Sequence, residues 1–444
     1  MRTLFVPLAV MALAVPPAFS QPVAGSHPSP IRPAAAATAE PAGPLDLRSA
    51  LALARQFNPG LSSASREREA TDAAVLQAGA WPNPVLEAQL EDLRRGNRTT
   101  TLQLSQPIEL GGKRAARVAA AERARDQAAS ALLARRSELR ASAITLFFEV
   151  LAAQERLRLA QDSVGLAEAA TRAAANRVAA GKVSPLEENR ARVAEAGIRV
   201  ELLQAEGALR SARQQLAALW GNPNPRFTRA DGALDRLPAA VEAGNVEGRL
   251  AAAPVLRQAR LEVERRQALS ELEQARRMPD LTVSLGAKRV PADEGMGSSS
   301  SSGRNQVVVG LSVPLPIFDT NRGNVAEALS REDKARDDLA VAELQLGADV
   351  AQATERLRSA RATAQTLQHD ALPGAEAAYK AAARGFELGK FGFLEALDAQ
   401  RTLFQVRSQH LLAVAEAHRA AAELDRLLGT GGEEETPHAA PAAR

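Results

Sequence analysis

Cysteine is absent from all 444 residues of the chain, and this absence excludes several kinds of site. Without cysteine there are no disulfides, no thiolate ligands for a metal ion and no lipid-modified N-terminal cysteine. Histidine is scarce too, and no two histidines are four residues apart on one helix face. We therefore expect no dedicated metal site and no cofactor, with the histidines as surface or packing residues. They are His27, His369, His410, His418 and His438.

Aromatic residues form only 3% of the chain, although 45% of its residues are hydrophobic. Because aromatic side chains supply much of the burial in ordinary globular cores, this alanine-rich chain predicts helices packed closely over small side chains. The net charge is only +3, and the basic residues lie on mixed-sign faces, so no nucleic-acid partner is expected. No nucleophile–base pair, phosphate-binding glycine loop or metalloenzyme motif occurs, which predicts that the protein is not an enzyme.

Long apolar runs are missing except at the N-terminus, where residues 1–20 are typical of a secretory signal peptide. Arg2 precedes the apolar segment 4–15, and a small-x-small cleavage site follows. The alternative is a buried N-terminal helix, which the Pro/Ala-rich linker at 21–44 disfavours. Since no later run has the length of a membrane-spanning helix, we expect any membrane span to be β.

A sequence repeat with an offset of about 207 residues organises the rest of the chain. Pro107 corresponds to Pro314 at one end of the unit, and Gly181 corresponds to Gly389 at the other. The predicted segments are the first copy at 45–220, an inter-repeat equatorial segment at 221–245, the second copy at 246–428 and a disordered tail at 429–444.

Each copy contains two segments of about ten residues in which apolar and mostly polar side chains alternate. The apolar faces are Thr100, Leu102 and Leu104; Leu86, Ala88 and Leu90; Leu281, Val283, Leu285 and Ala287; and Val307, Val309, Leu311 and Val313. This pattern is typical of tilted strands that span a membrane, with an ordinary soluble hairpin as the alternative. The segments 94–98 and 291–305 between the strands are expected to be extracellular loops.

A very long helix is predicted after each pair of strands. Lys113 to Ala180 contains no proline and a single glycine, which corresponds to a helix of about 100 Å. Apolar residues recur with the four-three spacing of a coiled-coil seam, and shorter helices return at about 185–220 and 393–428. The seam residues are Leu139, Ala143, Leu146, Val150, Ala153, Leu157, Ala160 and Val164, then Leu346, Val350, Ala353, Leu357, Ala360, Ala364 and Leu367. A free-standing dimeric coiled coil is the alternative, but it explains neither the strands nor the export signal.

Two copies of strand–strand–long helix–short helix behind a signal peptide resemble the TolC family of outer-membrane efflux proteins. The resemblance covers nearly all of 45–428, and the stretches LSQPIELGGKR (104–114) and VPLPIFDTNRG (313–323) are similar to the cobalt–zinc–cadmium subgroup paired with heavy-metal exporters. It implies an α plus membrane-β fold in which three chains form one twelve-stranded barrel, continued by a periplasmic α-helical barrel.

The resemblance also implies a function, a location and partners. The expected protein is a homotrimeric exit duct in the bacterial outer membrane, with a large periplasmic portion, that exports divalent heavy-metal cations. Its partners would be a periplasmic adaptor (a membrane fusion protein), an inner-membrane RND transporter and outer-membrane lipid. Two alternatives stay open: a similar duct for drugs, solvents or type I protein secretion, and a non-porous periplasmic coiled-coil scaffold.

Strand-to-helix junctions are the first group of candidate site residues. Proline removes a donor from the strand ladder, and glycine permits a tight change of direction. The junction residues are Pro107, Gly111, Gly112, Pro314 and Gly323. Lys113, Arg114 and Arg117 follow against the helix-dipole preference, which predicts an interfacial role near a membrane.

The helix-to-helix turns are the second group, and the resemblance implies that they dock the adaptor, with a plain hairpin turn as the alternative. These tips are Gly181, Lys182, Val183, Gly389, Lys390 and Phe391. Glu395 and Asp398 are three residues apart on one helix face, where the resemblance implies a periplasmic gate. Alternatively, these two acids only complement the helix dipole. The first copy has Glu187 and Glu188 in this region.

Overall fold

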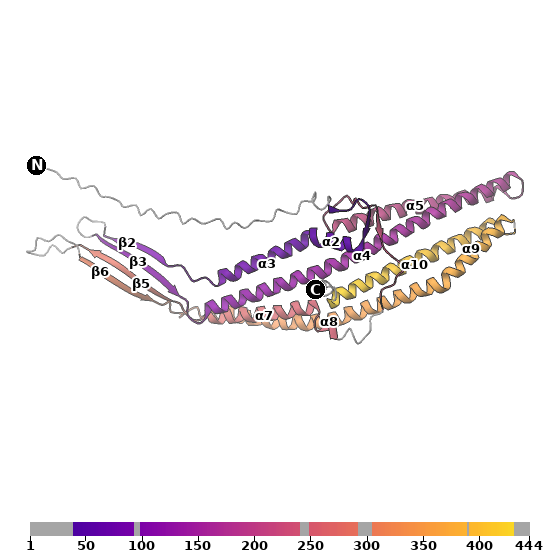
Figure 1. The fold of residues 1–444 in the computed structure, drawn as a ribbon. Coiled ribbons are helices and arrows are strands. Elements are labelled where there is room, and N and C mark those ends of the chain that lie inside the picture. The colour runs from indigo at the N-terminus through magenta and orange to yellow at the C-terminus, as the bar shows by residue number, and fades with distance from the viewer. Residues whose placement is uncertain (1–38, 93–97, 240–247, 292–303, 389, 430–444) are drawn as a thin grey trace, which may run out of the picture.

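The computed structural model describes residues 39–92, 98–239, 248–291, 304–388 and 390–429. The protein is elongated, with a sheet at one end and the turns between helices at the other (Figure 1). The two copies follow one another as predicted: two strands, a long helix and a shorter returning helix. Among the residues described, no helix combines the length and the apolar character needed to cross a lipid bilayer.

One antiparallel sheet contains the four predicted strands in the order β2-β3-β5-β6. The strands are β2 (Val85–Glu91), β3 (Thr99–Ile108), β5 (Leu281–Val290) and β6 (Arg304–Ser312). The predicted loops between the strands of each pair lie mostly outside the described residues. Strands β2 and β6 are therefore the two edges of this sheet, and each copy of the repeat contributes one of them.

The register of the sheet gives it one apolar and one polar face. Leu86 pairs with Leu104, Leu104 with Leu285, and Leu285 with Val309, which makes an exposed apolar row across all four strands. On the other face, Gln89, Thr101, Lys288 and Gln306 form a polar row. Because side chains alternate along a strand, a shift of one residue in any pair would mix the two faces. The predicted alternation is confirmed.

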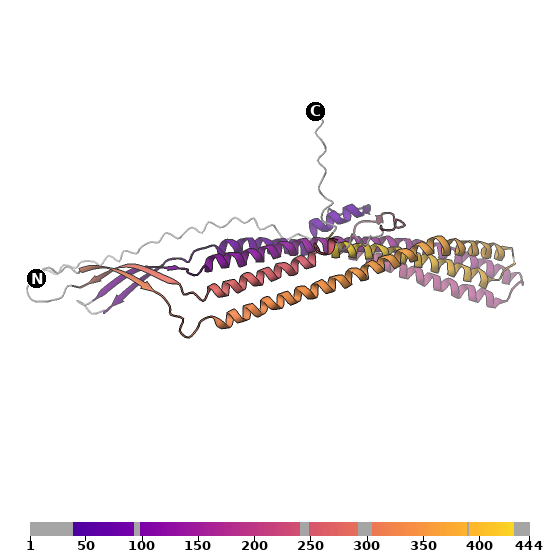
Figure 2. The ribbon, with the colours of Figure 1, turned by 90° about the horizontal axis from the view of Figure 1, so that it is seen from below.

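Four helices continue from the sheet and contact one another in the order α3–α4–α7–α8, which is the order of the strands. They are α3 (Pro59–Ala78), α4 (Lys113–Ala179), α7 (Pro254–Ala275) and α8 (Arg322–Thr366). Farther from the sheet, α5 (Pro185–Ala218) packs on α4, and α10 (Phe393–Leu428) packs on α4, α8 and α9 (Leu372–Glu387). Figure 2 shows the same arrangement from below.

The side chains of the predicted seams are buried or partly buried at the contacts between these helices. Five seam residues of α4 are buried, namely Leu139, Ala143, Val150, Ala153 and Ala160, and the other three are partly buried. In α8 the buried residues are Leu346, Val350, Ala353, Leu357, Ala360 and Ala364, with Leu367 partly buried just after it. Helix α4 runs for 67 residues without interruption. The second long helix instead contains a π-turn, η1 (Leu367–Ala371), directly before Pro373.

Chain segments outside the long helices pack against the middle of the molecule. Strand β4 (Arg229–Asp231), in the inter-repeat segment, pairs in parallel with β1 (Pro44–Asp46), which precedes helix α2 (Leu47–Phe57). Trp220 and Phe227 are fully buried there against Phe147 of α4. Some of the chain's few aromatic residues therefore gather in the core at this level.

Glu40 fixes this region and was not foreseen from the sequence, because it lies in the segment expected to be a linker. Its side chain is only 3% exposed. The carboxylate accepts hydrogen bonds from Trp220 Nε1 at 3.1 Å, from the Asn222 amide, and from the backbone N–H groups of Arg226 at 2.6 Å and Phe227 at 3.0 Å. These four donors compensate for the burial of a charge.

Two of the five histidines are packing residues in the same region. His418 of α10 stacks on Phe148, with ring centroids 3.5 Å apart and planes at 9°. Burial lowers the pKa of both His410 and His418. Within the described ranges, no group of three or more histidine, cysteine or acidic residues could hold a metal ion.

We predict that Glu40→Ala lowers the free energy of unfolding by about 3 kcal/mol, because three or four buried donors lose their acceptor. Glu40→Gln should have a smaller effect, since one amide oxygen keeps part of the network. Thermal unfolding of the purified protein, followed by circular dichroism, measures both changes. Glu67→Ala, at an exposed position of α3, is the control. Equal stability of Glu40→Ala and this control would contradict the assignment.

Candidate functional sites

The first strand-to-helix junction requires glycine for two reasons. Strand β3 ends at Ile108, one residue after Pro107, and α4 begins at Lys113. Gly111 and Gly112 both adopt the left-handed conformation, with φ of 69° and 72°. A Cβ at Gly111 would also lie 2.6 Å from the Cβ of Met278. The chain therefore changes direction here between two neighbouring elements, as predicted.

The second junction uses different residues for the same change of direction. Strand β6 ends at Ser312, Pro314 follows, and α8 begins at Arg322. The left-handed residue is Asn321, with φ of 56°, whereas Gly323 lies inside the first turn of α8 with open space around it. Asn321 was missed in the sequence, although asparagine is one of the few residues that adopt this conformation readily.

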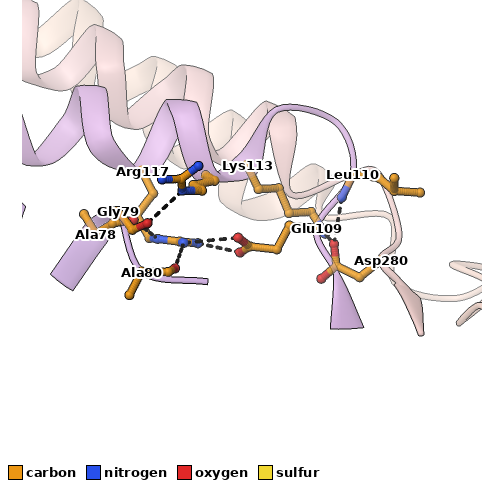
Figure 3. A network of polar contacts seen from close by, with 9 residues as sticks. Ala78, Gly79, Ala80, Glu109, Leu110, Lys113, Arg117 and Asp280 are labelled. Atoms are coloured by element: carbon orange, nitrogen blue, oxygen red, sulfur yellow. Dashed lines mark hydrogen bonds and ion pairs between the residues drawn. The ribbon is translucent and has the colours of Figure 1, made fainter. Parts of the chain in front are cut away.

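Basic side chains at the start of α4 have acidic partners within the same chain (Figure 3). Lys113 Nζ lies 2.6 Å from Asp280 Oδ1, and this oxygen also accepts the backbone N–H of Leu110 at 3.3 Å. Arg117 pairs in bidentate fashion with Glu109, at 2.5 and 3.1 Å. The hydrogen bond to Glu109 raises the pKa of the Arg117 guanidinium above its usual value.

Two arginines at the start of α4 cap the end of α3, and Figure 3 shows one of them, Arg117. Arg117 Nε donates to the carbonyl of Ala78 at 2.8 Å, and Arg114 Nε donates to that of Gly79 at 2.7 Å. Carbonyls at a helix C-terminus carry partial negative charge, so cations are favourable there. Cations at the start of α4 are unfavourable for the dipole of α4, and their hydrogen bonds to the carbonyls at the end of α3 offset this cost. These contacts connect α3 and α4 with the residue after β3 and the residue before β5.

The turns between helices lie together at the other end of the molecule (Figure 1). Helix α4 ends at Ala179, and Gly181 follows in the left-handed conformation with φ of 68°. Lys182 N donates to Arg177 O at 2.9 Å, which is a Schellman motif. The second turn repeats this bond from Lys390 N to Gly385 O at 2.8 Å, although Gly389 itself lies outside the described residues. The structure therefore places the two predicted tips side by side.

Glycine at 385 has a packing role that the sequence did not reveal. The Phe391 ring occupies the position where any other side chain at 385 would begin. Phe391 is nevertheless 46% exposed, and Val183 of the other tip is partly exposed. Leu186 and Leu388, which we did not single out, are exposed apolar residues beside them.

A cleft of about 290 Å³ separates the two turns. It is lined by Ala174, Arg177, Val183, Glu187, Phe386, Gly392 and Glu395. The Arg177 guanidinium stacks over the Phe386 ring at 5.0 Å and connects the first copy to the second. Acidic groups from both copies, Glu187 and Glu395, face this cleft.

The acidic residues of the two turns have different surroundings. Glu187 pairs with Arg190 at 3.3 Å, and Glu188 pairs with Arg192 at 2.6 Å. Glu395 and Asp398 are exposed, and neither forms an ion pair within the part of the chain that the structure describes. Because Arg190 stands at the repeat position of Asp398, only the second copy presents two uncompensated carboxylates on one face.

We predict that Arg117→Gln destabilises the junction by about 2 kcal/mol, because Glu109 loses its bidentate partner while remaining mostly buried. Arg123→Gln is the matched control in the same helix, since the side chains of Arg123 and of its partners Asp126 and Glu264 are 34–49% exposed. An exposed pair of this kind contributes at most about 1 kcal/mol. Denaturant unfolding of the purified variants separates the two, and equal losses would contradict a special role for Arg117.

Comparisons with known proteins agree with this architecture. CzcC, a cobalt-zinc-cadmium resistance protein of Cupriavidus metallidurans, is 44% identical over 431 residues, which is 97% of this chain and 100% of that protein. The nickel and cobalt resistance protein CnrC of the same organism is 30% identical over 320 residues, with 70% of each chain covered.

Solved structures show the fold independently. The outer-membrane channel OprN matches with a TM-score of 0.73 at 20% identity, covering 87% of this chain and 90% of that one. CusC matches with a TM-score of 0.71 at 18% identity, covering 86% and 91%. The family model for outer membrane efflux proteins matches residues 50–222 and 247–430, two ranges that overlap the two predicted copies of the repeat. The chain belongs to the outer membrane efflux protein family.

Proposed function

We propose that the protein is the passive exit duct of a tripartite efflux system that exports divalent heavy-metal cations. The observation that carries this proposal is the 44% identity, over the full length of the relative, to a cobalt-zinc-cadmium resistance protein. The second relative, at 30% identity, is a nickel and cobalt resistance protein. The metal is cargo in this proposal, and ion selection belongs to the inner-membrane transporter that supplies the energy.

The sheet supports assembly into a closed barrel. Its apolar row from Leu86 to Val309 suits contact with lipid, and its polar row from Gln89 to Gln306 suits a water-filled interior. Strands β2 and β6 have no partner on their outer sides in the described chain. Three copies joined through these edges form a twelve-stranded barrel that leaves no open edge in the membrane.

The turns support docking of an adaptor at the periplasmic tips. Lys182 and Lys390 are exposed, and Val183 and Phe391 offer apolar area close to them. An amphipathic helix of a partner can bury such apolar residues in a groove. In this proposal Gly181, Gly389 and their neighbours form the contact with a membrane fusion protein, which connects the duct to an RND transporter.

The uncompensated carboxylates support a cation-attracting constriction. Threefold symmetry brings the exposed Glu395 and Asp398 of three copies together, as six carboxylates near the inner end of the tunnel. A ring of acidic side chains with low-dielectric walls concentrates cations. The alternative in which these acids only complement the dipole of α10 remains an outcome of the gate experiment below.

Metal accumulation in a deletion strain tests the substrate. The strain is challenged separately with zinc, cobalt, cadmium, nickel and copper, and intracellular metal is measured beside the efflux of a cationic dye. We expect at least one metal to accumulate while dye efflux is unchanged, and the metals that accumulate identify the cargo. Accumulation of dye without metal would favour the drug-duct alternative instead.

A second prediction concerns the gate. The double variant Glu395→Gln/Asp398→Asn should lower the cation-over-anion permeability of the purified channel in planar bilayers, by roughly tenfold at low salt. Glu201→Gln, at an exposed position of α5, is the control. An unchanged permeability ratio in the double variant would leave the two acids with a role in the helix dipole only. A preparation without conductance in any variant would favour the non-porous scaffold.

A further inference from the structure

Large apolar side chains are exposed just outside the sheet, at both of its edges. After β6, Phe318 is 99% exposed, and Leu315 and Ile317 beside it are exposed as well. Before β2, Leu76 is 79% exposed and Trp81 is 61% exposed. The first three residues are called the apolar loop below, and the last two the Trp81 platform. Neither group takes part in the tips, the gate or the apolar row of the sheet.

The apolar loop is restrained at several points. Pro314 and Pro316 fix their own φ angles, and Ile317 N donates to Leu315 O at 2.9 Å. At the far end, the Asn321 side chain donates to the backbone carbonyl of Glu273 in α7 at 2.8 Å. The three apolar side chains are therefore presented to solvent by an anchored segment, and little ordering is needed when they are covered.

The Trp81 platform is held just as firmly. The Arg114 guanidinium lies 4.7 Å from the centroid of the Trp81 ring and covers one of its faces. Arg114 is itself fixed by its hydrogen bond to Gly79 at the end of α3. Arg114 thus covers one face of the ring, and the other face is open. Leu76 lies in the last turn of α3, five residues before Trp81.

The topology places these two groups on opposite sides of one protein and at the same level along it. Strand β2 leaves the junction and β6 returns to it, and the helices α3 and α8 continue the same two edges (Figures 1 and 2). A second copy that pairs its β2 with the β6 of the first therefore brings its Trp81 platform towards the apolar loop. The edge strands run in opposite directions in this pairing, as they do in every pair of the sheet.

We infer that the apolar loop of one copy packs on the Trp81 platform of the next. This contact rests on the proposed ring of three copies and adds a second interface to it, below the strands. The contact is head-to-tail, so each copy gives one loop and receives one, and the contacts close when the ring closes. It stabilises the ring where strand pairing ends, and it covers Phe318, an aromatic side chain that is almost fully exposed in the single chain.

The absence of cysteine in the natural chain allows a direct test by crosslinking. The pair Trp81→Cys/Phe318→Cys is oxidised in native membranes and separated on a denaturing, non-reducing gel. We expect covalent dimers and trimers that disappear on reduction. Leu76→Cys/Leu315→Cys is a second pair, which leaves Trp81 in place in case its replacement impairs folding. Leu110→Cys/Phe318→Cys is the control. Leu110 is exposed too, but it lies between β3 and α4, and β3 is not an edge strand of the sheet.

Crosslinks across the strand edges separate failure of this contact from failure of the ring. Cysteine at Val85 or Leu86 is combined with cysteine at Leu311 or Val313, which reports whether β2 meets β6 of another copy. If the edge pairs form crosslinks and neither loop pair does, the inferred contact is overturned and the ring of three copies still stands. This result is expected if lipid, and not a second copy, covers Phe318. The absence of both kinds of crosslink would overturn the ring and the inference together.

Discussion

Close packing over small side chains at the helix seams is the constraint on which the rest of the structure depends. Alanine at positions such as Ala143, Ala153, Ala353 and Ala360 allows long helices to approach closely along their length. Isolated helices gain little stability from propensity alone, so this continuous burial stabilises α4 along its length. The long helices that this packing stabilises set the distance between the sheet and the turns. Larger side chains occur where this packing changes, as around Trp220 and Phe227.

At the junction between β3 and α4, the chain changes from the side-chain period of a strand to that of a helix. Strands place side chains with a period of two and helices with a period of 3.6, so the residues between them cannot satisfy both patterns. Gly111 and Gly112 provide the turn, and Arg114 and Arg117 bind the carbonyls at the end of α3. The start of one helix therefore completes the end of another, and the sheet and the helices form one connected unit.

Local patterns predicted most of the fold, and contacts between distant residues account for what they missed. The alternating strands, the seams and the returning helices lie where the spacing of apolar residues placed them. Glu40 could not be found in this way, because its partners lie about 180 residues away and no local pattern marks a buried acceptor. The contact of Phe391 with Gly385 and the turn at Asn321 depend likewise on the folded chain. The gate, the docking tips and the ring stay predictions, since they involve partners beyond one chain.

The π-turn η1 distinguishes two helices that the repeat would otherwise make equivalent. Helix α4 is continuous, whereas its counterpart is interrupted between Thr366 and Leu372, beside a proline that cannot donate to the helix. Interruptions of this kind are where helices bend. In the proposed ring of three copies, continuous and interrupted long helices would alternate around the axis. The points where helices can bend would then repeat three times around the tube, although the repeat makes its backbone nearly sixfold.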